Sequence, residues 1–100
     1  MENIELSAQQ EHVQILPENE EAMITGLPFQ VILYNDNWHT FDEVINHLVK
    51  ATRCSYNKAR DFAFEVHVTG KALVFSGSLQ ECLRVTSVLE EIELNTQIVS

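Results

Sequence analysis

Apolar positions recur with two different periods in residues 27–100, and each change of period marks the boundary of a predicted element. Residues 29–34 (Phe-Gln-Val-Ile-Leu-Tyr) are rich in β-forming residues with a period of two, which predicts a strand. Thr40 and Glu43 have the spacing of a capping box, which places the start of a helix at residue 41. The apolar positions that follow form one helical stripe: Phe41, Val44, Ile45, Leu48 and Val49.

The rest of the chain predicts two further helices and two short strands. Ser55 is a suitable N-cap for a helix that runs from about residue 56 to residue 68, and Gly70 is a natural stop. The remaining elements are a strand, a helix opened by a second capping box and a closing strand, at residues 71–76, 79–92 and 97–99. The order β-α-α-β-α-β predicts an α+β domain with three helices packed on a small three-stranded antiparallel sheet.

Residues 1–26 differ from the rest of the chain in charge and in pattern. They contain six Glu and no Lys or Arg, their helical periodicity is weak, and Pro17 interrupts them. One-sided charge without a clear period is typical of a segment that does not fold by itself. We therefore expect a flexible acidic N-terminal extension over residues 1–26, followed by a single domain over residues 27–100.

Composition and charge exclude several classes of protein. A chain of 100 residues with 45% hydrophobic residues suffices for one small core. The formal net charge of −9 argues against nucleic acid or an anionic membrane as a partner, because both require a basic surface. The chain has no apolar run long enough to span a bilayer, no secretory signal, and two cysteines without CxxC spacing. We expect a cytoplasmic protein with reduced thiols.

Motifs for catalysis, phosphate binding and metal binding are absent from the sequence. It contains no GxSxG, HExxH, P-loop or GxGxxG motif. The histidines do not pair with the cysteines at zinc spacing; they stand at positions 12, 39, 47 and 67. The sequence therefore predicts a protein that is not an enzyme and that needs neither cofactor nor metal.

Two polar features remain that the predicted fold does not require. Asn35, Asp36 and Asn37 separate the first strand from the first helix, and taken alone they are ordinary turn formers. His67 lies near the end of the second helix, where a histidine is usually exposed or interacts favourably with the helix dipole. Neither feature is specific by itself.

Together, these residues resemble the ClpS family of Clp-protease adaptors. The similarity rests on three motifs: residues 29–37, then Phe41-x-x-Val44-Ile45, then Val66-His67-x-x-Gly70-Lys71-Ala72. The resemblance covers residues 28–100, and it implies an adaptor that binds substrates with a bulky hydrophobic N-terminal residue. Such adaptors deliver these N-degron substrates to a Clp AAA+ unfoldase of the ClpA or ClpC type, which feeds the ClpP protease.

The resemblance also implies the residues of the binding site. Asn35, Asp36, Asn37 and His67 would surround the α-amino group of the substrate. The pocket for the first side chain would be lined by Phe41, Val44, Ala63 and Val66, with His39 near its rim. This chemistry is reasonable, since an α-ammonium group has three donors and no acceptor, and amide, carboxylate and neutral imidazole groups supply acceptors.

Three positions depart from the usual family pattern. Asn37 replaces a common Asp, Phe41 replaces a common gating Met, and Ala63 replaces a larger residue. On the third helix, Glu81 and Arg84 are the nearest candidates for contacts with the unfoldase. Two alternatives stay open: a ClpS-like domain that has lost degron binding and keeps a docking or regulatory role, and an interaction domain of the ribosomal-stalk type that recruits translation factors.

Overall fold

The strands of the protein form one four-stranded sheet in the order β1-β4-β2-β3. The computed structural model describes residues 13–16 and 27–100. The central strand β2 is antiparallel to both β3 and β4, while β1 is parallel to β4. The strands span Val13–Leu16 (β1), Phe29–Tyr34 (β2), Lys71–Gly77 (β3) and Thr96–Val99 (β4).

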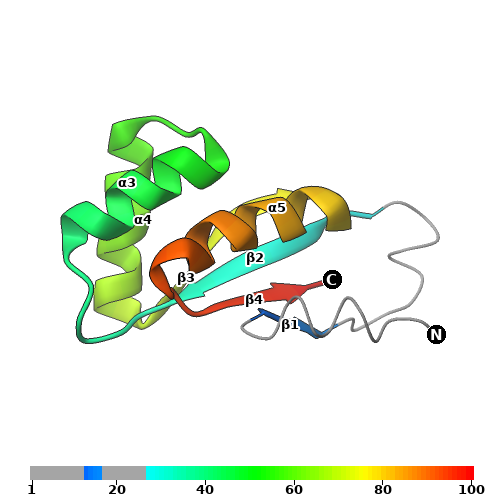
Figure 1. The fold of residues 1–100 in the computed structure, drawn as a ribbon, viewed down its shortest axis with the longest axis horizontal. Coiled ribbons are helices and arrows are strands. Elements are labelled where there is room, and N and C mark those ends of the chain that lie inside the picture. Colours follow the sequence, from blue (N-terminus) through cyan, green and yellow to red (C-terminus); the bar gives the residue numbers. More distant parts are fainter. Residues whose placement is uncertain (1–12, 17–26) are drawn as a thin grey trace.

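Three α-helices lie on one side of this sheet: α5 runs along it, and α3 and α4 lie together near the end of β2 (Figure 1). They span Phe41–Thr52 (α3), Tyr56–Thr69 (α4) and Leu79–Leu89 (α5), and the short 3-10 helix η1 (Glu90–Ile92) extends α5. From β2 onward the order is β-α-α-β-α-β, and the strands β4-β2-β3 form the expected three-stranded antiparallel sheet. The predicted α+β fold is confirmed.

Strand β1 is an element that the sequence analysis did not predict. Its residues 13–16 pair in parallel with residues 96–99 of β4 and add a fourth strand at the edge of the sheet (Figure 1). Four residues with little alternation give no usable local pattern, so only the contact with β4 defines this strand. The other residues of the predicted extension, 1–12 and 17–26, lie outside the described residues, and their flexibility stays a prediction.

The helices begin and end at the residues that local chemistry indicates. Thr40 and Glu43 form both hydrogen bonds of a capping box at the start of α3, and Ser78 and Glu81 do the same at the start of α5. Helix α4 ends at Gly70, whose φ of 95° lies in the left-handed region that glycine adopts without steric cost. These caps define where the chain enters α3 and α5 and where it leaves α4.

The core lies between the helices and one face of the sheet. Val31 and Leu33 of β2 are fully buried, as are other large side chains of the same core: Leu48 of α3, Leu89 of α5 and Ile98 of the neighbouring strand β4. Helix α4 contributes smaller residues, among them Ala63. Among the described helices, none has the length and apolar composition needed to cross a membrane.

Candidate functional site

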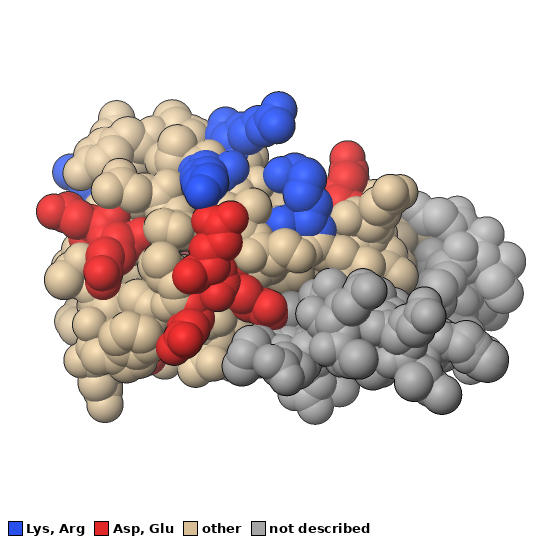
Figure 2. Space-filling model, in the orientation of Figure 1, with Lys and Arg blue, Asp and Glu red and all other residues tan. Residues whose placement is uncertain are grey.

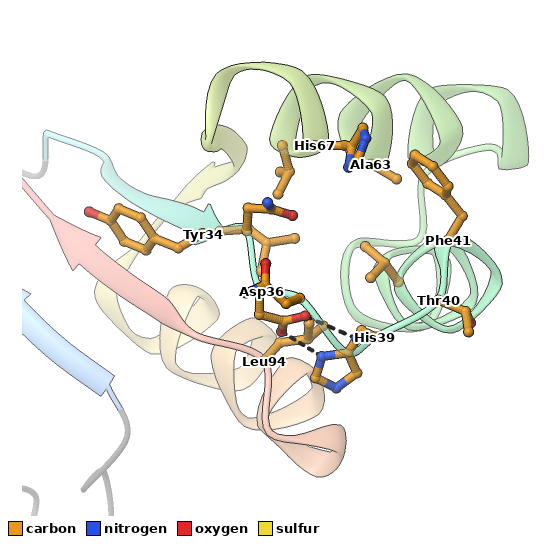
Figure 3. A pocket seen from close by; sticks show the side chains of 13 residues that line it. Tyr34, Asp36, His39, Thr40, Phe41, Ala63, His67 and Leu94 are labelled. Carbon is orange, nitrogen blue, oxygen red and sulfur yellow. Dashed lines mark hydrogen bonds and ion pairs between the residues drawn. The ribbon is translucent and has the colours of Figure 1, made fainter.

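A pocket of about 390 Å³ lies where the end of β2 meets α3, α4 and the connection to β4 (Figure 3). All nine site residues named from the sequence line it: Asn35, Asp36, Asn37, His39, Phe41, Val44, Ala63, Val66 and His67. Four further residues line it that the sequence analysis did not assign to the site: Leu33, Tyr34, Thr40 and Leu94. Residues separated by up to about 60 positions in the sequence thus share one cavity.

The polar side of the pocket is the turn that follows β2. Its backbone is held from two directions: the N–H of Tyr34 donates to the carbonyl of Asn95 at 3.0 Å, and the N–H of Asn35 donates to the carbonyl of Gly70 at 2.9 Å. Asn35 and Asn37 are both exposed to solvent. The turn therefore presents two amides on a backbone that the ends of α4 and β4 position.

Both carboxylate oxygens of Asp36 have hydrogen-bond partners within this turn. Its Oδ1 accepts hydrogen bonds from the backbone N–H groups of Trp38 and His39, at 3.2 and 3.0 Å, and its Oδ2 lies 2.5 Å from Nδ1 of His39. Burial alone would raise the pKa of this carboxyl, but the hydrogen bonds from His39 and Trp38 outweigh it and lower the pKa below its ordinary value. Both oxygens of Asp36 therefore hold the turn together.

His39 lies inside the protein and not at an open rim. Only 1% of its side chain is exposed; Nδ1 contacts Asp36, and Nε2 contacts the carbonyl oxygen of Ile92 in η1. The indole of Trp38 covers the ring, with 3.9 Å between the ring centroids. Figure 3 shows Asp36 and His39 together on the side of the pocket opposite His67.

The apolar side of the pocket is formed by α3 and α4 together with the floor of the sheet. Val44 is half-buried, Ala63 and Val66 are buried, and Leu94 closes the pocket from the connection before β4. Phe41, which is 46% exposed, meets His67 edge-on with 5.3 Å between the ring centroids. Leu94 carries no local sequence signal, because its role depends on a contact between segments about 60 residues apart.

Among the described residues, no cysteine or serine side chain lines the pocket. Within residues 13–16 and 27–100, no group of three His, Cys, Asp or Glu side chains is arranged to hold a metal ion. Cys82 is fully buried in the core, and this burial raises the pKa of its thiol to about 11, so the reactive thiolate is not formed at neutral pH. The arrangement combines hydrogen-bond acceptors with an apolar wall, which suits binding.

Comparison with known proteins places this chain in a family. A family model described as ATP-dependent Clp protease adaptor protein ClpS matches residues 26–97. The solved structure of Agrobacterium tumefaciens ClpS2 bound to L-phenylalaninamide has a similar fold, with a TM-score of 0.62. The match covers 71% of this chain and 93% of that chain, at 21% sequence identity, so it concerns the fold.

Parts of two much longer animal proteins are also similar to this chain. E3 ubiquitin-protein ligase UBR1 of Drosophila melanogaster is 32% identical over 82 residues, which cover 81% of this chain. E3 ubiquitin-protein ligase UBR2 of Mus musculus is 34% identical over 74 residues, which cover 74% of this chain. In both cases the matched segment amounts to 4% of the length of the relative.

Proposed function

Because the chain belongs to the ClpS family of Clp protease adaptors, we propose that its pocket binds the free N-terminal residue of a substrate protein. Asn35, Asn37 and His67 accept hydrogen bonds from the α-amino group, with Asp36 beside them. Phe41, Val44, Ala63 and Val66 enclose the first side chain, and His39 borders the pocket. No bond is made or broken in this role, which is that of an adaptor.

The observation that carries the proposal is that the polar turn after β2 and the apolar side chains of α3 and α4 line one cavity. An α-ammonium group needs acceptors, and the amides of the turn and the imidazole of His67 are suitable side chains on the pocket wall. A bulky apolar side chain gains about 1.5–3 kcal/mol on full burial, and the α3–α4 wall provides that environment. That ClpS2 is bound to L-phenylalaninamide, a molecule with a free amine and an aromatic side chain, supports the same choice of ligand.

Blocking the amine is expected to weaken binding at least about tenfold, since each hydrogen bond to a charged group contributes roughly 1.5–3 kcal/mol. The measurement is a calorimetric titration with peptides that begin with Phe, Leu, Trp or Ala, each in free and N-acetylated form. At least one bulky-residue peptide should bind, and its acetylated form should not bind comparably. Equal binding of the two forms would contradict recognition of the amine and favour a domain that has lost degron binding.

His67→Ala provides the internal check on this experiment. If His67 accepts a hydrogen bond from the amine, the loss caused by acetylation should be smaller in His67→Ala than in the unmodified protein. His47→Ala is the matched control, because His47 is another α-helical histidine but does not line the pocket. An acetylation effect of the same size in all three proteins would remove His67 from the amine site.

The finer proposal for the partner is a Clp AAA+ unfoldase of the ClpA or ClpC type. Membership of the ClpS family supports it, whereas the similarity to segments of ubiquitin ligases shows that related domains also occur in other proteins. Glu81 and Arg84, the docking candidates, both have internal contacts: Glu81 caps α5, and Arg84 donates to the carbonyl of Ala51 at 3.1 Å. In Figure 2, basic side chains lie over the region of α3 and α5, and acidic side chains lie directly beside them.

Delivery is expected to be visible in a reconstituted degradation assay. A reporter that begins with Phe should be degraded faster by an unfoldase and ClpP when the protein is added, and a reporter whose N-terminus is blocked should not respond. ClpA and ClpC are tested side by side. Tight peptide binding without acceleration by either unfoldase would leave the recognition role standing and contradict the Clp partner.

A further inference from the structure

His39 is buried in a position where both of its ring nitrogens face acceptors. Nδ1 lies 2.5 Å from the carboxylate of Asp36, and Nε2 is hydrogen-bonded to the carbonyl oxygen of Ile92. A neutral imidazole has one N–H and one lone pair, so it can satisfy only one of these two oxygens. The doubly protonated ring donates to both, which makes it the form that fits the site.

The charged groups around His39 favour the same form. Asp36 of the same turn and Glu43 of the first turn of α3 both act on the ring with negative charge, and η1 faces it with the carbonyl of Ile92. Burial by itself lowers the pKa of His39, but the hydrogen bonds to Asp36 and Ile92 and the two carboxylates outweigh it and raise the pKa above its ordinary value. Trp38 adds an aromatic face against the ring.

His39 connects two parts of the pocket that are distant in the sequence. Through Asp36 it holds the turn that carries Asn35 and Asn37, and through Ile92 it holds the η1 segment, which is followed by Leu94 in the pocket wall. The same Asp36 carboxylate accepts the backbone N–H groups that shape the turn. Loss of either ring N–H would therefore remove one of the contacts that position the polar wall, beside the backbone hydrogen bonds of Tyr34 and Asn35.

We infer that His39 is a positioning residue of the amine-binding turn, held as an imidazolium that bridges the Asp36 carboxylate and the Ile92 carbonyl. The effect of His39 on ligand affinity rests on the proposed function, whereas the bridge itself does not. It gives Asp36 a different task from the one implied by the family resemblance: its charge is matched by His39, and it acts on the substrate through the shape of the turn. Direct acceptance from the amine then falls to Asn35, Asn37 and His67.

The pH range of this device follows from the two pKa shifts. A histidine with a raised pKa stabilises the fold fully below its ordinary value of 6.5, and the contribution is lost as the pH rises through the raised value. A carboxylate with a lowered pKa stabilises the fold above its ordinary value of 3.8, and the contribution is lost as the pH falls through the lowered value. The bridge is intact between these two limits.

The protonation state is tested directly by nitrogen NMR of the full, unsubstituted chain labelled at its histidine rings. At about pH 7, where an ordinary imidazole with a pKa near 6.5 is mostly neutral, both ring nitrogens of His39 should still carry protons. A neutral ring at about pH 7 would overturn the inference. This measurement uses no peptide, so its result does not depend on whether the proposed function is correct.

The consequence for binding is tested with His39→Gln, and His47→Gln serves as the matched control. Glutamine has a single donor group that does not titrate, so His39→Gln should lose about tenfold in affinity for a free Phe-peptide at pH 6–7, the equivalent of one hydrogen bond to a charged group. The ratio of the affinities of the unsubstituted protein and His39→Gln should fall towards one as the pH rises through the pKa of His39. Titration of the peptide amine cancels in this ratio.

Two further outcomes separate this inference from the proposed function. Amide exchange at Trp38 and His39 should accelerate in His39→Gln but not in His47→Gln, because these two N–H groups donate to Asp36. If the unsubstituted protein shows no amine-dependent binding, the proposed function fails, while the NMR and exchange results still decide the bridge. An affinity ratio that stays constant across the pH range, or unchanged exchange, would overturn the role of His39.

Discussion

Ala63→Met is expected to weaken binding of a Trp-starting peptide by about ten- to a hundredfold, while a Leu-starting peptide loses less. Ala63 is 3% exposed and lies on the α4 wall of the pocket, so added side-chain atoms occupy space that the ligand would fill. Excluding most of a large side chain forfeits roughly 1.5–3 kcal/mol of burial, and each 1.4 kcal/mol is a factor of about ten in affinity.

The double variant Phe41→Met/Ala63→Met is the matched control for this prediction. Phe41 lies close to Ala63 in Figure 3, and both residues line the pocket. Phe41 is larger and Ala63 is smaller than the residue common in the family at that position. Exchanges that conserve volume are tolerated best in packed sites, so reducing Phe41 should restore part of the affinity that Ala63→Met removes. Titration with Trp-, Phe- and Leu-starting peptides measures this. Unchanged binding by Ala63→Met would show that Ala63 does not border the first side chain.

Leu48→Ala is expected to lower the free energy of unfolding by about 2–5 kcal/mol, the range for deletion of a fully buried leucine side chain. Leu48 is 0% exposed and packs in the core between α3 and the sheet. The free energy of unfolding of a small domain is about 5–15 kcal/mol in total, so this single change removes a large part of the stability. Urea unfolding, followed by circular dichroism, gives the value from the shift of the midpoint.

Leu73→Ala is the control that separates burial from residue type. Leu73 is also a leucine, but it is 41% exposed on β3. Truncating its side chain should therefore lower the free energy of unfolding by less than about 1 kcal/mol. If the two variants lose equal stability, the core is not where the structure places it. A changed slope of the unfolding curve in Leu48→Ala would instead indicate a change in the unfolded or native ensemble.

The helices and the central strand could be predicted from local signals because each signal acts within a few residues. The two capping boxes require only a hydroxyl and a carboxylate three positions apart, and both form as predicted. Gly70 ends α4 for an equally local reason, since its backbone adopts a positive φ. Strand β1 lacks such a signal, and its pairing with β4 joins segments more than 80 residues apart.

From the sequence, the resemblance to the ClpS family indicated nine residues for the site, and all nine line the pocket, but no signal in the sequence indicated Leu94. Only the tertiary structure showed which polar groups of the site already have partners within the protein. Both nitrogens of His39 are in contact, one with the nearby Asp36 and the other with Ile92 in a distant segment. Leu94 likewise enters the pocket wall through long-range packing. Such contacts depend on how the elements pack against each other. Periodicity and short motifs describe neighbouring residues only, so they do not predict these contacts.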